Sequence, residues 1–537
     1  MTDLANRVHA SLEQAHRWWP LTGAAVCVVD PNAELLLASS GLTDASSGAP
    51  VGPGTRFEIG SISKSFTSFA LGALADEGRV ELSASVLDHL PWLTPRARFA
   101  PITLRHLMSH TSGLICGADA VPDAAAAGLA LRDSEVGAAP GEFFHYSNIG
   151  YAVLGLVIER ITGEPVGAVV TDRLLAPLEM RESAATITHN DRASMATGYQ
   201  ALHDDRPLLP GDPLTPATWF EVAAADGNII ATASDLGRYA RMLLGRGRLD
   251  ATQIVSVERF AELTDEDPSP QAQRRYALGL EVEQEGGGHR LTHGGGMVGY
   301  SSFLAVDMQA QRGVVVLTNA PGESGVAERL ARRVLAAAVG EPETSPASDL
   351  DASLIPDAEN HVGSYGEGAL RIEVQRRAAG QLQLVAGETT GRLYHLGEGR
   401  LGCDHPDWRV FPHRLERAGA SSRWLYGPHA LAPAGTPAPR TASEVGGADP
   451  FVGHYRSWTP WYPSFRVVQR DGALMLIAGS GVEAPANELE LLQVEERTFR
   501  VGADPRLPER LVFAAPVDGV SFEAVRDGCR YSRSFRP

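Results

Sequence analysis

The sequence predicts an α/β domain of about 340 residues followed by an all-β, barrel-like region. Helical and strand-like patterns alternate in the first region, and almost no helical periodicity follows it. The later region also repeats itself at an offset of about 90 residues. A chain of 537 residues is long enough for two to four domains. We therefore expect three units, at residues 1–340, 353–432 and 448–537.

The first unit begins with a helix and a pair of strands. Apolar residues have helical spacing over Leu4–Trp19, and a proline follows. Two short runs, Gly23–Asp30 and Ala33–Ser39, predict strands joined by a turn. A strong helical pattern then covers Ser61–Asp76, and the glycine after it, Gly78, is typical of a helix C-terminus.

A helical insertion and a second group of strands complete this unit. From residue 87 to residue 244 the pattern is mostly helical, interrupted by loops rich in proline and glycine. Strand patterns then occur at Ala277–Glu283, Arg290–His293, Ser301–Val306 and Gly313–Asn319. A last helix is expected over Gly325–Ala338. This order of elements indicates one α/β domain.

The all-β region contains two related units. Two segments have the composition of linkers, Glu341–Ser348 and Pro433–Arg440. The following pairs of segments repeat each other: Val362–Tyr365 and Val452–Tyr455, and Leu382–Gly387 and Leu474–Gly479. Each unit alone would expose sheet edges, so we expect closed or partly closed barrels.

Charge, cysteines and termini limit the partners and the compartment. With 47 basic and 65 acidic residues the net charge is −18, so we expect neither a nucleic-acid nor a membrane partner. The four cysteines are far apart, so neither a disulfide framework nor a metal site is expected. No export signal or 18-residue apolar stretch is recognisable, which predicts a cytoplasmic protein. The oligomeric state is left open, a homo-oligomer included.

One residue suggests catalysis. Lys64 is the only lysine, so the other 46 of the 47 basic residues are arginines. Arginine stays protonated at any usable pH, whereas a buried lysine can lose its proton and act as a base. Lys64 follows Ser61 by one turn at the predicted helix start, so the two side chains share a face. Ser61 is therefore a candidate nucleophile and Lys64 its candidate base.

Two further segments would complete such a site. Tyr146-Ser147-Asn148 falls between helical stretches, which would let the phenol of Tyr146 serve the leaving group as a proton carrier. The small residues Gly294–Gly296, after His293, would let backbone N–H groups approach a developing oxyanion. Taken alone, each segment also has a plainer interpretation: a tyrosine that packs a loop, and a flexible glycine turn.

As a set, Ser61-Ile62-Ser63-Lys64, Tyr146-Ser147-Asn148 and His293-Gly294-Gly295 resemble the three motifs of the serine β-lactamase and penicillin-binding-protein-like hydrolases. The resemblance covers about residues 5–340 and is closest to the class C-like branch, which includes esterases and D-aminopeptidases. It implies a central antiparallel sheet with a helical cluster. The two β units are similar to the tails of three-domain D-aminopeptidases and of relatives with lipocalin-like tails.

The resemblance implies a role for each motif residue. Ser61 would be the nucleophile, Lys64 its general base and Tyr146 the acid/base partner. Backbone N–H groups of Ser61 and Gly296 would form the oxyanion hole. In the D-aminopeptidase-like relatives a tail loop enters the cleft, and here a turn within Gly387–Arg400 or near Ser457–Ser464 is expected to do the same.

The remaining motif residues narrow the substrate. By the resemblance, Asn148, His293 and Gly295 would bind or orient it. In penicillin-recognising members a lysine and a neighbouring hydroxyl bind the substrate carboxylate, and here those positions are His293 and Gly294. Histidine is only partly charged near neutral pH and glycine has no hydroxyl. This favours an aminopeptidase, amidase or esterase over a β-lactamase.

We therefore expect a serine hydrolase that needs no cofactor and acts through an acyl-enzyme. Its substrates would be small amides, short peptides or esters, as in a D-aminopeptidase/amidase or esterase. Three alternatives stay open: an acyltransferase or peptide-cyclising thioesterase of the same fold, a β-lactamase or D-Ala carboxypeptidase, and a non-catalytic ligand-binding protein.

Other patterns are given structural interpretations. His293–Gly296 also resembles the oxyanion motif of α/β-hydrolases, but the G-x-S-x-G elbow of that fold is missing from the sequence. His106 and His110 lack the intervening glutamate of a zinc-protease motif and are interpreted as part of a structural turn. Trp458 and Trp461 could form a binding platform, but ordinary β packing is the favoured interpretation.

Overall fold

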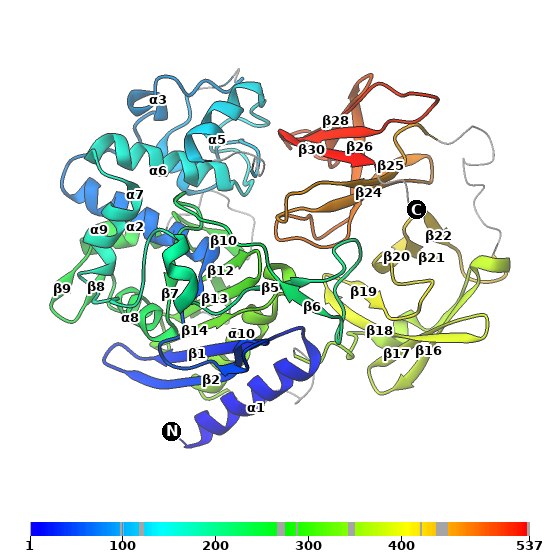
Figure 1. Cartoon of the computed structure of the whole chain (residues 1–537), viewed down its shortest axis with the longest axis horizontal. Coiled ribbons are helices and arrows are strands. Elements are labelled where there is room, and N and C mark those ends of the chain that lie inside the picture. Colours follow the sequence, from blue (N-terminus) through cyan, green and yellow to red (C-terminus); the bar gives the residue numbers. More distant parts are fainter. Residues whose placement is uncertain are drawn as a thin grey trace.

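The computed structural model describes residues 2–96, 99, 101–117, 123–265, 274–285, 288–341, 350–418, 421–436 and 449–533. Most of the first predicted linker, residues 342–348, and the end of the second, residues 437–440, lie outside the described residues. The unit boundaries therefore stay predictions. The described part confirms the predicted fold class, because a sheet with helices is followed by two β units (Figure 1).

An antiparallel sheet joins strands from both ends of the N-terminal region. Its order is β10 (Arg274–Tyr276), β11 (Glu281–Glu285), β12 (Gly288–Met297), β13 (Tyr300–Asp307), β14 (Arg312–Thr318), β1 (Gly23–Val29), β2 (Glu34–Asp44) and β3 (Ala49–Pro50). β1 pairs with β14 on one side and β2 on the other, so the early and late predicted strands form a single sheet.

Helices cover both faces of this sheet, which explains why every residue of β1 is buried. Val26 and Val28 pack with α1 (Thr2–Trp18) and α10 (Val326–Ala338). Cys27 and Val29 face the other way and pack with α2 (Ser63–Asp76) and α8 (Ala233–Leu244). Alternation of side chains along a strand thus feeds two separate cores.

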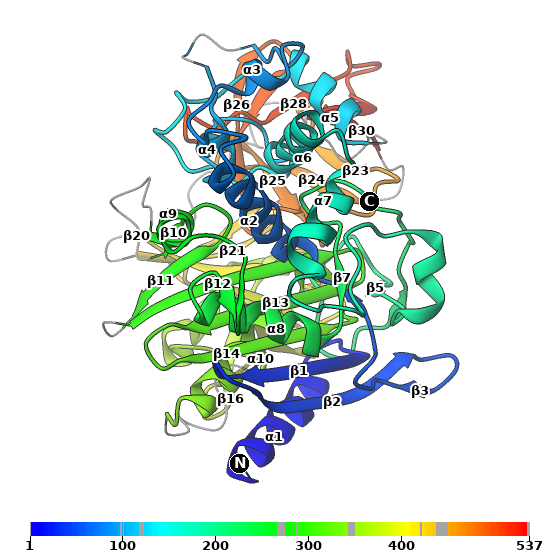
Figure 2. The same cartoon turned by 90° about the vertical axis from the view of Figure 1, so that its left-hand side faces the viewer.

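The helical insertion lies beyond one edge of the sheet, next to α2 (Figure 2). Its helices are α3 (Val86–His89), α4 (Leu104–Met108), α5 (Ala124–Ala130), α6 (Asn148–Thr162) and α7 (Val166–Val170), and α9 (Val257–Asp265) lies near α2. α6 starts at Asn148 because the Ser147 hydroxyl accepts the Gly150 N–H at 3.1 Å.

Three short strand pairs complete the N-terminal region. They are β4 (Phe57–Glu58) with β7 (Ile230–Ala231), β5 (Tyr199–Ala201) with β6 (Leu214–Pro216), and β8 (Arg248–Leu249) with β9 (Thr252–Gln253).

The first β unit is a sheet whose two ends meet. Its strands are β15 (Gly363–Tyr365), β16 (Ile372–Ala378), β17 (Gln381–Ala386), β18 (Thr389–Gly397), β19 (Arg400–Cys403), β20 (His413–Ala418), β21 (Ser421–Tyr426) and β22 (His429–Leu431). The Gly366 N–H donates to the Ala432 carbonyl and the Ala434 N–H to the Ser364 carbonyl, both at 2.8 Å. These bonds nearly close a barrel around a core that includes Trp424.

The second β unit is a closed barrel. Its strands are β23 (Gly453–Arg456), β24 (Ser464–Arg470), β25 (Ala473–Ala478), β26 (Leu489–Glu495), β27 (Thr498–Val501), β28 (Arg510–Phe513), β29 (Glu523–Arg526) and β30 (Cys529–Arg533). Its core is rich in aromatic side chains, among them Tyr455, Phe465 and Tyr531. Closure pairs β23 with β30 and leaves this barrel without a free edge.

The two β units have different neighbours. Tyr394 of the first unit joins the core beneath α1 and α10, and the Trp19 indole N–H donates to the Leu350 carbonyl at 2.8 Å. The second unit lies beside the helical insertion (Figure 1), where the Arg510 guanidinium is 3.5 Å from the Glu135 carboxylate. Within the described ranges, every helix is too short or too polar to traverse a bilayer.

Candidate active site

Ser61 lies in a tight turn just before α2. The sequence predicted that Ser61 begins the helix, but residues Gly60–Ile62 form a 3₁₀ turn and α2 begins at Ser63. The reason is a close approach of backbones: Gly60 has φ +52°, and a Cβ placed there would lie 2.9 Å from the Gly296 nitrogen. Only a glycine lets this turn rest against β12.

Lys64 contacts Ser61 as the spacing predicted. Its Nζ donates to the Ser61 Oγ at 2.9 Å and to the Asp226 backbone carbonyl at 2.8 Å, and the side chain is fully buried. Burial lowers the pKa of Lys64, whereas negative charge at Asp226, Glu483 and Cys116 raises it. Once Lys64 loses its proton, this geometry lets it accept the proton of Ser61.

Tyr146 lies in the loop that leads into α6 and lines a cavity together with Ser61. The Lys64 Nζ is 5.1 Å from the centre of the Tyr146 ring, and the centres of the His110 and Tyr146 rings are 4.1 Å apart. Burial raises the pKa of Tyr146 well above its usual value, so the phenol keeps its proton near neutral pH. Ser61, Lys64 and Tyr146 therefore lie close together.

His110 supports this loop, although the sequence suggested only a structural turn for it. The Ser147 N–H donates to its Nδ1 at 3.0 Å, and its ring lies against Tyr146 and Tyr276. Burial lowers the pKa of His110 well below its usual value, and Lys64 adds to this effect. A neutral His110 thus fixes the Tyr146 loop without adding charge.

The glycines of the third motif lie inside β12 rather than before a strand. Gly294, Gly295 and Gly296 pair with Phe303, Ser302 and Ser301 of β13. A Cβ on Gly295 would lie 2.0 Å from the Ile59 carbonyl oxygen and 2.2 Å from the Ser302 Oγ. The missing side chains therefore allow β12 to press against the Ser61 turn, which brings Gly296 and Ser61 together.

Replacing Gly295 with alanine should separate this strand from the Ser61 turn. We expect kcat/KM to fall by about a hundredfold or more, in the range seen when one oxyanion donor is lost. Gly294→Ala is the matched control, because its Cβ would meet only the Phe303 ring at 3.6 Å. Steady-state kinetics on a small ester tests this; equal losses in both variants would contradict it.

His293 is buried in β12 with both ring nitrogens in contact with protein groups. Its Nε2 is 2.8 Å from the Tyr276 hydroxyl and its Nδ1 is 2.6 Å from the Gly294 carbonyl. Burial lowers the pKa of His293 to about 3, so the ring is neutral at physiological pH. His293 consequently brings no positive charge to the site.

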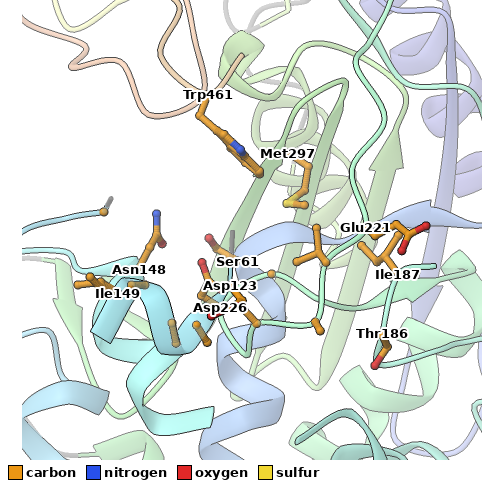
Figure 3. A pocket seen from close by; sticks show the side chains of 18 of the residues that line it. Ser61, Asp123, Asn148, Ile149, Thr186, Ile187, Glu221, Asp226, Met297 and Trp461 are labelled. Atoms are coloured by element: carbon orange, nitrogen blue, oxygen red, sulfur yellow. The ribbon is translucent and has the colours of Figure 1, made fainter. Parts of the chain in front are cut away.

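Two cavities meet at Ser61. The larger, about 560 Å³, is lined by Asn148, Asp226, Met297 and Trp461 among others, and Figure 3 shows Trp461 projecting toward Met297 and Ser61. The smaller, about 290 Å³, includes Tyr146 and the three β12 glycines. Ser61, Asn148, Gly296 and Glu483 line both. This arrangement offers separate space on each side of a carbonyl bound at Ser61.

The second β unit completes the walls of these cavities. Glu483, in the loop between β25 and β26, accepts a hydrogen bond from Asn148 Nδ2 at 2.6 Å and one from Cys116 Sγ at 3.4 Å. Glu509 holds the same region, because its Oε1 lies 2.6 Å from His145 Nε2 and accepts the Cys116 N–H at 3.0 Å. The tail therefore positions residues on both sides of Tyr146.

Of the two tail turns expected to enter the cleft, one lines a cavity at Ser61. Trp461, within Ser457–Ser464, lines the larger cavity, whereas the Gly387–Arg400 turn contributes Tyr394 to the core beside α1 and α10. The interpretation of Trp458 and Trp461 as β packing is wrong. Trp458 is fully exposed, and Trp461 lies in the loop before β24.

Sequence reasoning missed Asp226 and Glu483. A signal for Glu483 was present in the repeat: after Gly387 the next strand begins two residues later, whereas after Gly479 it begins only at Leu489. An insertion at a repeated turn marks a loop with its own role. Asp226 carried no comparable signal. Among the described residues, no cluster of three or more His, Cys, Asp or Glu side chains suits a metal ion.

Comparison with known proteins agrees with this geometry. The family model described as Beta-lactamase matches residues 15–339. Protein flp of Staphylococcus aureus (strain N315) is 26% identical over 326 residues, covering 59% of this chain and 62% of that protein. Esterase EstB of Burkholderia gladioli is 31% identical over 246 residues, covering 42% of this chain and 60% of that protein. The chain thus spans about three fifths of the length of these curated relatives.

Solved structures share the fold. An octameric penicillin-binding protein homologue from Pyrococcus abyssi aligns with a TM-score of 0.59 at 22% identity, covering 80% of this chain and 98% of that one. The D-amino acid amidase from Ochrobactrum anthropi SV3 aligns with a TM-score of 0.54 at 25% identity, covering 63% of this chain and 99% of the amidase.

Proposed function

This chain belongs to the beta-lactamase family, and from that premise we propose that it is a serine hydrolase acting on small amides, peptides or esters through an acyl-enzyme on Ser61. The observation that carries the proposal is the 2.9 Å contact between Lys64 Nζ and Ser61 Oγ where two cavities meet. Ser61 attacks the carbonyl, Lys64 takes its proton, and Tyr146 with Lys64 returns a proton to the leaving group. The Ser61 and Gly296 N–H groups hold the oxyanion.

We further propose that the preferred substrate carries a free amine beside the scissile carbonyl, as in an aminopeptidase or amino-acid amidase. Among the described residues that line the larger cavity, the ionisable side chains are all acidic: Asp123, Glu159, Glu221, Asp226 and Glu483. Glu483 is the one that also lines the smaller cavity beside Tyr146. A carboxylate has about four acceptor positions, so Glu483 can bind an ammonium while keeping Asn148 and Cys116.

A free amine should raise kcat/KM by about tenfold or more over the N-acetylated form of the same alanine p-nitroanilide, as expected for one charged hydrogen bond. The Glu483→Gln variant should lose most of this difference through a higher KM. Glu221→Gln is the control, since Glu221 lines the larger cavity and accepts the His189 N–H at 3.1 Å. D- and L-alanine substrates are assayed in parallel to fix the stereochemical preference. Equal rates on free and acetylated substrates would refute amine recognition.

A β-lactamase or carboxypeptidase activity is disfavoured by the lack of a partner for a substrate carboxylate. Neither cavity is lined by an arginine or lysine in the described part of the chain, and His293 is neutral. We expect kcat/KM on a chromogenic cephalosporin to be at least about a hundredfold lower than on a small ester, a difference of about 2.7 kcal/mol. Efficient cephalosporin hydrolysis would overturn this assignment.

A further inference from the structure

Two acidic side chains from different parts of the chain act on Lys64 through their charge. Its Nζ donates to the backbone carbonyl of Asp226, whose side chain lines the larger cavity with Ser61. Glu483 approaches from the second β unit and lines both cavities. Glu483 also accepts hydrogen bonds from Asn148 and Cys116.

Burial lowers the pKa of Lys64, and the negative charges at Asp226 and Glu483 act in the opposite direction. The titratable groups that face it in the described structure are Asp226, Glu483, Cys116, Tyr146, Tyr151, His110 and His293. Both histidines are neutral near pH 7 and both tyrosines keep their protons. A protonated Lys64 cannot accept the proton of Ser61.

We propose that the ammonium of the substrate replaces Lys64 as the counter-ion of Glu483 and Asp226, so that Lys64 releases its proton and becomes the base for Ser61 only when an amine-bearing substrate is bound. This rests on the proposed function, in which Glu483 binds that amine. The carboxylates would otherwise oppose catalysis, because negative charge stabilises the protonated form of a lysine. Of these two carboxylates, Asp226 raises the pKa of Lys64 more than Glu483 does.

Protons and charge balance through the cycle. One ammonium enters and one proton leaves Lys64 for solvent, so the net charge of the site is unchanged. The Ser61 proton then moves to Lys64 as the Oγ–C bond forms, and it passes through Lys64 and Tyr146 to the leaving nitrogen or oxygen as that bond breaks. Water hydrolyses the acyl ester, and the same pair accepts and returns its proton.

The wild-type enzyme tests the inference with a matched pair of substrates, alanine ethyl ester and lactate ethyl ester. The ascending limb of the kcat–pH profile reports the deprotonation of Lys64 in the complex. We expect this limb to lie at least about one pH unit lower for the alanine ester, within the range that one nearby charge produces. Superimposed limbs, or a lower limb for the lactate ester, would overturn the proposal.

Two variants test which carboxylate keeps Lys64 protonated before the substrate binds. Glu483→Gln and Asp226→Asn each remove a charge at nearly constant shape, and the Asp226 carbonyl that binds Lys64 is retained. Both should move the ascending limb for the lactate ester to lower pH and reduce the difference in limb position between the two substrates. Glu221→Gln should leave both limbs in place. A lactate-ester limb unmoved by either of the first two variants would refute the assignment.

A binding measurement separates this inference from the proposed function. Alaninol carries the amine but has no scissile bond, and titration calorimetry in two buffers of different ionisation enthalpy counts the protons released. We expect about one proton released per alaninol bound near pH 7. Binding without proton release overturns the inference but leaves amine recognition intact. If Glu483→Gln has an unchanged KM for the alanine ester, amine recognition itself fails.

Discussion

Replacing Ser61 with alanine is expected to abolish turnover and covalent labelling by a fluorophosphonate. Without the Oγ there is no acyl-enzyme, and loss of a nucleophile typically lowers kcat by about 10⁴-fold or more. The fold should be retained, because Ser61 forms a turn whose position depends on Gly60 and β12 rather than on its own side chain.

The labelling measurement should be made on native and heat-denatured protein, with circular dichroism to confirm that the variant is folded. Ser63 provides a matched control, since it is the neighbouring motif serine and its Oγ accepts the Ile229 N–H at 3.2 Å. Ser63→Ala should label at Ser61. Full labelling of Ser61→Ala would place the nucleophile elsewhere.

Replacing Lys64 with arginine should be nearly as damaging as removing Ser61, although the positive charge is kept. Arginine does not lose its proton at usable pH, so it cannot accept the Ser61 proton. Loss of a general base commonly costs about 10²–10⁴-fold in rate. The fully buried Lys64 also lacks room for the larger guanidinium.

Lys64→Met separates the proton-transfer role from that of size and charge, because methionine keeps most of the volume and loses the amine. Both variants should be inactive on esters between pH 6 and 10 while remaining folded by thermal denaturation. If Lys64→Arg kept more than about a tenth of the wild-type kcat, Lys64 would act as a fixed charge and not as a base.

The sequence was informative where chemistry depends on neighbours along the chain. Ser61 and Lys64 are three residues apart, so their contact follows from local helical geometry even though a 3₁₀ turn replaces the first helical turn. The two β units were visible because alternating burial and turn residues recur with a fixed offset.

Other predictions failed where a side chain's direction depends on the whole sheet. The sequence correctly identified the glycine run beside the Ser61 turn, but β12 turns the His293 ring toward Tyr276 and buries it. A motif position alone therefore did not reveal that this histidine is buried and neutral.

By itself, then, the sequence determined the family, the order of the elements and the serine–lysine pair, because each is encoded by local spacing or by repetition. Only the tertiary structure decided what surrounds that pair. Glu483 and Trp461 reach the cavities because the second β unit packs beside the helical insertion. Asp226 lies there because its backbone carbonyl accepts a hydrogen bond from Lys64 of α2. Contacts between such distant segments depend on how folded surfaces fit together, and periodicity along the chain does not encode that fit.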